Sequence, residues 1–380
     1  MGVKYSSPLS VALLRDSQKG ILGEDVLQMG VVDLLELIAS ATNELDGSGS
    51  PIHALTIVDL DKNPPPRPDL VARVASEIKW RLPLTVGISR TTPDPVYEKL
   101  LEAMTFVVVG EDMGRVETVV ARDVDETVAV LERAVSATPL AAIAFAQVLR
   151  QTARLGVWQG LVAESATYSM LQSGPEFVTW LSRTECLPPI NKADQVVRIW
   201  REGMSLRVRL DHPERRNAFG RQMRDELVAA LDIAIADPAI ERVLLSGQGP
   251  HFCSGGDLSE FGTSSDVVTA HLVRLVRNAG WRIHRLGSRV SVRVQGSCIG
   301  AGVEIPAFAS HVVSGSNASF RLPEVSMGLV PGAGGCVSIT RRIGRWRTAW
   351  LGLSGIELDA FTALHWGLID ELENDRSRDS

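Results

Sequence analysis

Strand-like and helical segments alternate along residues 196–372, and this alternation constrains the fold more than any other feature of the chain. Two segments that alternate apolar and charged residues meet at Glu202-Gly203, as the strands of an antiparallel hairpin do. A helical pattern and a short buried strand, Arg242–Gly247, follow, and strand and helix alternate again from Val290 to Leu353. The pattern therefore predicts an α/β fold with largely parallel strands.

Two glycine-rich turns interrupt this pattern where a strand ends. The first is the loop from Gly249 to Phe261, which contains the paired glycines Gly255 and Gly256, and the second is Gly300-Ala301-Gly302, which opens a helix predicted over 301–309. Glycine leaves backbone amides accessible, and a helix N-terminus collects free N–H groups. If the two turns face each other, they form a site for an oxygen that gains negative charge, which is an oxyanion hole.

Two acidic residues, Glu304 and Glu324, follow the second turn. Two carboxyl groups that lie close together and partly buried do not both ionise readily, so one is held protonated near neutral pH. Such a pair suits a proton donor and a proton acceptor acting on one substrate. The sequence therefore predicts an enzyme, although a single glutamate near a helix start is more often a structural residue.

The first half of the chain repeats the order of elements in weaker form. Gln28-Met29 is expected to open a helix, as Gln222-Met223 does 194 residues later. Where the second half carries its glycine turn, the first half has Pro93 and Pro95, which remove amide donors. We interpret the first half as a degenerate duplicate without an anion site, with coincidental α/β similarity as the alternative.

A proline-rich stretch marks the domain boundary. The chain has 380 residues, which exceeds what one hydrophobic core usually supports. The stretch after Cys186 contains paired prolines and polar residues, as a linker between domains does. The predicted division is a first domain with a helical tail (1–185), a linker (186–195), a catalytic core (196–373) and a polar tail (374–380).

Composition excludes several classes of function. A net charge of −6 argues against nucleic acid as a partner. No apolar run approaches the roughly 20 residues of a membrane span, so we expect neither a membrane segment nor a secretory leader. The four cysteines lack the spacing of a metal site or a disulfide framework, which predicts reduced thiols, no metal and a cytoplasmic location.

These segments together resemble the crotonase (enoyl-CoA hydratase/isomerase) superfamily over residues 203–372. The matching segments are 211–219 (DHPERRNAF), 251–258 (HFCSGGDL), 296–304 (GSCIGAGVE), 320–324 (FRLPE), 328–335 (GLVPGAGG), and the pieces Leu353-Ser-Gly and Gly367-Leu-Ile-Asp of the C-terminal part. They occur in the family's order. The resemblance implies the crotonase-like ββα superhelical fold.

The resemblance also implies roles for particular residues. The amides of Ser254 and Ala301 would form the oxyanion hole, and Glu304 and Glu324 would be the two catalytic acids. The implied contacts to CoA come from Arg215, Arg216, Ala218, Gly255 and Asp257. Gly300, Gly302 and Gly332 would shape the turns.

The implied reaction is the addition of water to a 2-enoyl CoA thioester, or its reversal, without a further cofactor. Glu304 would deprotonate the water and Glu324 would protonate C2. An enoyl-CoA isomerase or a thioester-dependent C–C hydrolase on the same fold is one alternative, and a non-catalytic acyl-CoA-binding scaffold is another. The family implies a homo-oligomer built on trimers.

Two departures from the family pattern affect the expected geometry. Pro306 lies inside the predicted catalytic helix, where a proline removes a backbone hydrogen bond. The chain also stops soon after Leu372, where family members continue with helices that close the acyl pocket. We expect helices within 138–185 to cover the active half instead, from the same chain or from a neighbour.

Overall fold

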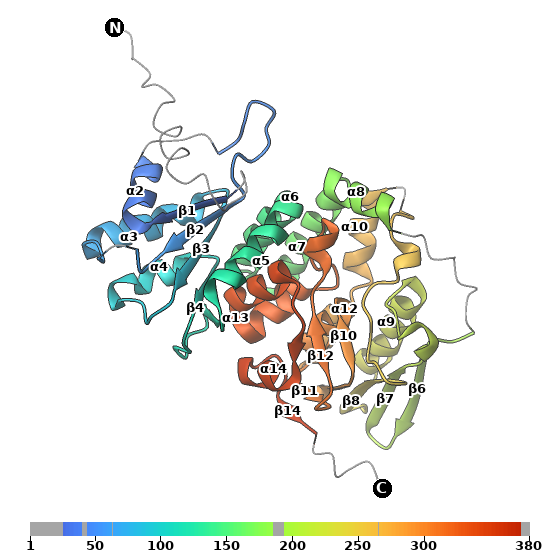
Figure 1. Cartoon of the computed structure of the whole chain (residues 1–380). Helices are drawn as coiled ribbons and strands as arrows, with labels where there is room; N and C mark the ends of the chain where they lie inside the picture. The colour runs from blue at the N-terminus through green and yellow to red at the C-terminus, as the bar shows by residue number, and fades with distance from the viewer. Residues whose placement is uncertain (1–25, 40–43, 63, 185–193, 265, 374–380) are drawn as a thin grey trace.

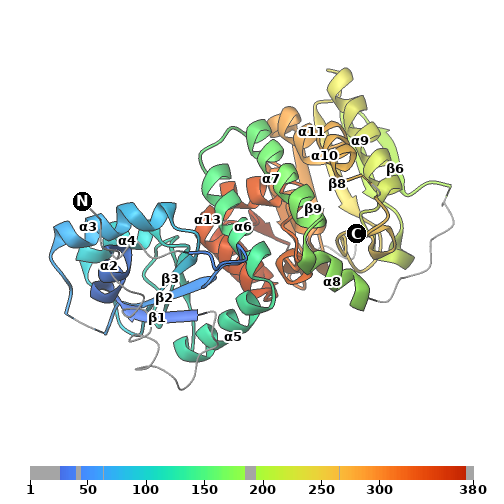
Figure 2. The ribbon, with the colours of Figure 1, turned by 90° about the horizontal axis from the view of Figure 1, so that it is seen from above.

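The computed structural model describes residues 26–39, 44–62, 64–184, 194–264 and 266–373. Two β-sheet regions lie at opposite ends of the molecule, with a layer of helices between them (Figure 1). The same arrangement is visible from above, where the middle is occupied by α6 (Pro139–Thr152), α7 (Val157–Gln172) and α13 (Gly335–Ser354) (Figure 2). The predicted linker (186–195, described only from 194) and the tail at 374–380 lie largely or wholly outside the described residues.

The first half forms one five-stranded sheet. Its strands are β1 (Val26–Gly30), β2 (Leu55–Asp59), β3 (Leu84–Ser89), β4 (Phe106–Val109) and β5 (Thr118–Val120). They are all parallel and lie in the order of the sequence. The helices are α2 (Val31–Ala39), α3 (Pro68–Glu77), α4 (Glu98–Ala103) and α5 (Val124–Ala137).

Both faces of this sheet are buried, which is why its strands read as continuous apolar runs. Val58 and Val107 pack with residues of α2, α3 and α4 on one face. Their neighbours Ile57 and Val108 point to the other face and pack with α5, α6 and α13.

The second half contains the larger sheet, in the order β14-β11-β9-β8-β7-β6. Its strands are β6 (Val197–Glu202), β7 (Ser205–Leu210), β8 (Arg242–Gly247), β9 (Val290–Val294), β11 (His311–Ser314) and β14 (Glu371–Leu372). Only β6 and β7 pair antiparallel, which confirms the predicted hairpin at Glu202-Gly203 and the largely parallel sheet.

A smaller three-stranded sheet and several helices complete this half. The strands are β10 (Ser297–Ile299), β12 (Ser319–Arg321) and β13 (Leu358–Asp359). The helices are α9 (Arg221–Ala236), α10 (Val267–Val276), α11 (Ala279–Leu286), α12 (Ala301–Glu304), α13 (Gly335–Ser354) and α14 (Ala360–Trp366).

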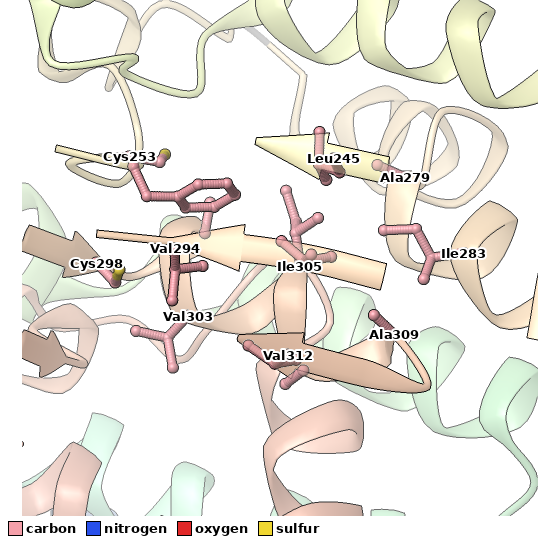
Figure 3. Packing of buried hydrophobic residues seen from close by; sticks show 14 of the residues in the cluster. Leu245, Cys253, Ala279, Ile283, Val294, Cys298, Val303, Ile305, Ala309 and Val312 are labelled. Carbon is pink, nitrogen blue, oxygen red and sulfur yellow. The ribbon is translucent and has the colours of Figure 1, made fainter. Parts of the chain in front are cut away.

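The core of the second half lies around the central strand β9. Figure 3 shows Leu245 of β8, Val294 of β9 and Val312 of β11 packed with Ile283 of α11 and Ile305, which follows α12. All five side chains are at most 4% exposed. The short helix α12 is therefore held at its apolar side by the sheet, while its last residue, Glu304, remains available for other contacts.

A layer of three helices joins the two halves. These helices are α6 (Pro139–Thr152), α7 (Val157–Gln172) and α8 (Pro175–Arg183). Gly352 of α13 lies so close to the Phe145 ring of α6 that a Cβ there would collide with it. Trp350 of α13 packs edge-on against Phe106 of β4, with ring centroids 5.5 Å apart. The sheet of the first half, the helical layer and α13 thus share one core, which spans the predicted domain boundary.

One prediction about the elements of the first half is wrong. Gln28 and Met29 lie in β1, whereas Gln222 and Met223 lie in α9, so the proposed correspondence between the halves fails where it begins. The first half also has no hairpin within its sheet among the described residues. The prediction of a duplicated fold is therefore not confirmed.

The predicted helix over 301–309 is also shorter than expected. α12 ends at Glu304, and a 3-10 turn, Pro306–Phe308, follows it. Pro306 has no N–H to continue the helical bonding, which accounts for the break.

Among the described residues, no single helix is long and apolar enough to cross a bilayer. The helices α5 and α6 reach that length only together, and they are bent by 105°.

Candidate active site

A cavity of about 580 Å³ opens between the helical layer and the second half. Tyr168 of α7 and Phe177 of α8 line it from the helical layer. The tight turn at Gly332 accommodates the Tyr168 ring, because a Cβ at Gly332 would lie 2.7 Å from that ring. The helices within 138–185 therefore cover the second half, as the sequence predicted, and of the two alternatives left open they do so from the same chain.

Five of the residues predicted for the site line this cavity. They are Asp257, Ala301, Glu304, Glu324 and Gly332. No group of three or more His, Cys, Asp or Glu side chains in the described parts of the chain is arranged to hold a metal ion.

Glu304 is a buried carboxyl group anchored by backbone amides. Its side chain is 2% exposed, and its Oε2 accepts hydrogen bonds from Ala333 N (2.7 Å) and Gly335 N (2.8 Å). The Ser338 hydroxyl donates to the Glu304 carbonyl oxygen at 2.8 Å. Burial raises the pKa of Glu304 to about 7, against the effect of the neighbouring amides. The position and the ionisation of this carboxyl group thus depend on the turn that begins α13.

Glu324 has much poorer hydrogen bonding. It begins the 3-10 turn Glu324–Met327, and its Oε2 is buried without a partner among the described residues. Burial raises the pKa of Glu324 well above its usual value, and the negative charge of Glu304 raises it further. At neutral pH, Glu324 is therefore the protonated member of the pair.

A third carboxyl group, Glu164 of α7, was not predicted as part of the site. It is 1% exposed, and it accepts hydrogen bonds from Gly334 N and Cys336 N, both at 2.8 Å. These two amides alternate along the chain with those that bind Glu304. Burial raises the pKa of Glu164 well above its usual value, and Glu304 adds to the shift. The sequence signal was an acidic residue within an apolar helix.

The two glycine turns lie against each other, as the sequence predicted. Ile299 N donates to the Cys253 carbonyl oxygen at 3.0 Å. Gly302 packs on the same carbonyl group so closely that a Cβ there would collide with it. Figure 3 shows Cys253 and Cys298 on these neighbouring segments, and both thiols are free and buried.

The structure corrects one of the two predicted oxyanion donors. Ser254 N donates to the Arg216 carbonyl oxygen at 3.0 Å, and Ser254 does not line the cavity. Two residues further on, Gly256 lines the cavity, and its amide donates to no described residue. The amide of Ala301, the first residue of α12, is likewise without an acceptor among the described residues. The pair of available amides is therefore Gly256 and Ala301.

A buried asparagine fixes the loop that carries Gly256. Asn217 has a left-handed backbone (φ 53°), and its Nδ2 lies 2.9 to 3.1 Å from the carbonyl oxygens of Gln248, His251 and Phe252. Its Oδ1 accepts a hydrogen bond from His212 N at 2.8 Å. The motif around Asn217 thus holds the strand exit in place.

The residues predicted to bind CoA lie around this loop. Arg215 Nη2 forms an ion pair with Asp257 Oδ1 at 3.0 Å, which engages both side chains. Arg216 is exposed and has a left-handed backbone (φ 51°). Ala218 follows in the same turn, and Gly255 adopts φ 89° against the second glycine turn. Whether these residues bind CoA stays a prediction.

Comparison with known proteins covers the second half of the chain. Residues 202–376 match the family model "Enoyl-CoA hydratase/isomerase". The chain is 31% identical over 172 residues to the 2,3-dehydroadipyl-CoA hydratase of Escherichia coli K12, covering 45% of this chain and 67% of that protein. It is 30% identical over 164 residues to the trans-2-decenoyl-[acyl-carrier-protein] isomerase of Streptococcus mutans, covering 42% of this chain and 62% of the relative.

Solved structures match the same half. An enoyl-CoA hydratase from Thermoplasma volcanium GSS1 is 30% identical, with a TM-score of 0.43, over 48% of this chain and 73% of that chain. The matched regions thus span about two thirds of the length of the curated relatives. The family resemblance read from residues 203–372 is confirmed, and the chain belongs to the enoyl-CoA hydratase/isomerase family of enzymes.

Proposed function

We propose that this chain adds water to a 2-enoyl thioester of CoA, or removes water in the reverse direction. One observation carries the proposal. Two carboxyl groups with different hydrogen bonding, the buried Glu304 and the half-buried Glu324, line the same cavity as two amides without an acceptor among the described residues, Gly256 and Ala301.

The amides provide the electrostatic part of the mechanism. The thioester carbonyl oxygen accepts hydrogen bonds from Gly256 N and Ala301 N, which draws electrons from the conjugated double bond and makes C3 electrophilic. Each donor of this kind is worth about 3 to 4 kcal/mol of transition-state stabilisation. The reaction needs no further cofactor in this proposal, because the substrate itself brings the CoA thioester.

The carboxyl groups provide the proton transfers. Glu304, ionised above pH 7 or so, removes a proton from water as the water oxygen bonds to C3. The electrons of the double bond move to C2, which takes the proton of Glu324. Exchange with solvent then returns the proton from Glu304 to Glu324. Arg216, whose exposed side chain forms no ion pair with a described residue, is the candidate contact for the CoA phosphates.

The test uses a panel of 2-enoyl-CoA thioesters and follows the loss of their conjugated absorbance. We expect Glu304→Gln and Glu324→Gln each to lower kcat by about 10²- to 10⁴-fold, the range of general acid–base catalysis. Glu371→Gln, an exposed acid on β14, is the matched control and should retain activity. Absence of any absorbance change with the wild-type protein across the panel would refute hydration.

Isomerisation of the double bond is the second candidate, favoured by the similarity to the decenoyl isomerase. It moves one proton between two carbons of the acyl chain, so a single carboxyl group suffices. Product analysis separates the two functions, because hydration yields a 3-hydroxyacyl thioester and isomerisation yields a 3-enoyl thioester. Full isomerase turnover by Glu304→Gln would favour isomerisation through Glu324 alone.

A further inference from the structure

Four arginines line the cavity, and one of them differs from the others. Arg221 pairs with Glu260, and Arg224 and Arg277 both pair with Asp225. The fourth, Arg274 of α10, forms no ion pair with any described residue. A guanidinium stays protonated in proteins, so Arg274 brings a positive charge to the cavity wall. Glu164 acts on this charge electrostatically, but no carboxylate of the described residues contacts the guanidinium.

Neutral groups of α7 hold the Arg274 side chain in place. Its Nε donates to Ser165 Oγ (3.2 Å), and its Nη2 donates to Ser169 Oγ and lies 3.4 Å from the Ser165 carbonyl oxygen. Its Cζ lies over the Tyr168 ring, 4.5 Å from the centroid. Nη1 donates to no described residue. Neutral groups therefore fix the Arg274 side chain, and the two N–H groups of Nη1 remain able to donate hydrogen bonds to a ligand.

Burial makes this arrangement costly without an anion. Burial lowers the pKa of Arg274, which indicates that the charged form has lost hydration. A partly buried guanidinium that no carboxylate contacts is left without a hydrogen-bonded anionic partner, and its planar shape matches a carboxylate in geometry. An anionic group entering the cavity would restore the balance of charge.

The position of Arg274 indicates which part of a thioester would meet it. Its guanidinium stacks on Tyr168, and the Tyr168 ring lies against Gly332, next to the Ala333 amide that binds Glu304. Arg274 is thus separated from the turn that holds Glu304 by one aromatic ring. In a CoA thioester, the pantetheine arm separates the CoA phosphates from the reacting carbons by far more than the width of one aromatic ring. The apolar side chains of Phe261 and Val273 line the same cavity and suit the methylene groups of an acyl chain.

We infer that Arg274 binds a carboxylate at the distal end of the acyl chain, so that the preferred substrate is the CoA monothioester of a 2-enedioic acid. The inference rests on the proposed function for the identity of the thioester, and it adds the chemical class of the acyl group.

The test compares two substrates of equal length, trans-2-hexenoyl-CoA and its ω-carboxylate counterpart. The wild-type enzyme should have the higher kcat/KM for the carboxylate. Arg274→Gln should reduce that preference about 10- to 100-fold, as expected for a hydrogen-bonded charge pair. Arg274→Lys should retain part of it, because the charge remains and the planar fork is lost. Arg277→Gln, which removes an arginine already paired with Asp225, should leave the preference unchanged.

Two results would overturn the inference. One is a wild-type enzyme that does not prefer the carboxylate. The other is an Arg274→Gln variant that weakens both substrates and free CoA to the same extent, which would assign Arg274 to a CoA phosphate.

A binding experiment separates this inference from the proposed function. If neither substrate is turned over, hydration fails, and calorimetry with hexanedioyl-CoA and hexanoyl-CoA still tests Arg274. Tighter binding of the dicarboxylic thioester by the wild type, lost in Arg274→Gln, supports the inference. Equal affinities contradict it.

Discussion

Glu304 and Glu324 carry the same functional group in two different environments. Two backbone amides stabilise the charged form of Glu304, whereas one oxygen of Glu324 is buried without a partner among the described residues. Hydrogen bonds to a carboxylate lower its pKa, and burial raises it. The two groups therefore ionise at different pH values, which is what an acid and a base acting together require.

The first prediction concerns the pH dependence of activity. The pKa of Glu304 is raised from 4.5 to about 7, and a base must be ionised, so kcat/KM should fall as the pH is lowered through about 7. The same shift means that the native state binds this proton more tightly than the unfolded chain. Its contribution to stability therefore declines as the pH rises from about 4.5 to about 7 and is constant above that.

A pH–rate profile from pH 5 to 9 checks this prediction. Circular dichroism at each pH serves as the control that the loss of activity is not unfolding. An acidic limb centred near 4.5 would show that Glu304 has an ordinary pKa.

The second prediction concerns Glu164. Glu164→Ala leaves the amides of Gly334 and Cys336 buried without acceptors, at about 1 to 3 kcal/mol each. We expect the free energy of unfolding in urea to fall by about 2 to 6 kcal/mol, the sum for the two amides. We also expect kcat to fall, because the same turn positions Glu304.

The matched control is Asp123→Ala, which removes the side chain that caps α5. It should lower the free energy of unfolding by about 1 kcal/mol and leave kcat unchanged. An unchanged kcat and an unchanged acidic limb in Glu164→Ala would limit Glu164 to a role in stability.

At the scale of elements, the turn before α12 leaves the space in which the Glu324 side chain lies. Gly300 has φ 50° and ψ −116°, and its missing side chain leaves room for Oε1 of Glu324. Gly287, at the end of α11, has similar angles (φ 59°, ψ −129°) but no neighbour within 4 Å of its Cβ position. Both positions thus have a backbone conformation that would strain any residue other than glycine, but only Gly300 lies against Glu324.

The third prediction uses this difference. Gly300→Ala and Gly287→Ala should both lower stability by about 1 to 3 kcal/mol, the cost of a strained residue. Only Gly300→Ala should lower kcat, by about 100-fold, because the new methyl group displaces Glu324 and a misplacement of about 1 Å has effects of that size. Steady-state kinetics and thermal unfolding of both variants measure the two effects. Equal kcat values would show that Glu324 does not need this space.

Several elements were predictable because their signal is local. The β6–β7 hairpin and the buried strand β8 follow from side-chain alternation and apolar runs. Gln28 and Met29 were assigned to the start of a helix by analogy with Gln222 and Met223. They instead form β1, and the helix begins after them at Val31, because β1 is defined by its long-range pairing with β2. Ser254 was wrongly assigned as an oxyanion donor for a related reason. Only the fold shows that its amide already donates a hydrogen bond to the Arg216 carbonyl oxygen.

At the scale of the whole molecule, the two halves depend on each other. The cluster that contains Phe106 and Phe145 of the first half also contains Trp350 and Leu353 of α13. The helix α7 supplies both Glu164 and the cavity residue Tyr168. The catalytic half therefore lacks part of its core and part of its site when it stands alone.

The fourth prediction follows from this shared core. A fragment of residues 194–380 should lose cooperative unfolding and enoyl-CoA hydration, because it exposes the apolar side of α13. The control is the full chain cleaved at a protease site inserted within 186–193, which keeps both pieces and should remain active. A fragment that folds cooperatively and turns over substrate would show that the halves are independent.

The sequence by itself determined the α/β class, the hairpin and the family, and it singled out Glu304 and Glu324 as candidate acids, because these depend on short-range patterns and on motifs contiguous in the chain. The tertiary structure alone decided which amides remain available, that Glu164 holds the same turn as Glu304, and that no carboxylate of the described residues contacts Arg274. Each of these depends on which distant group comes within hydrogen-bonding distance. The long-range packing of α7, α10 and α13 sets that distance, and no local pattern encodes it.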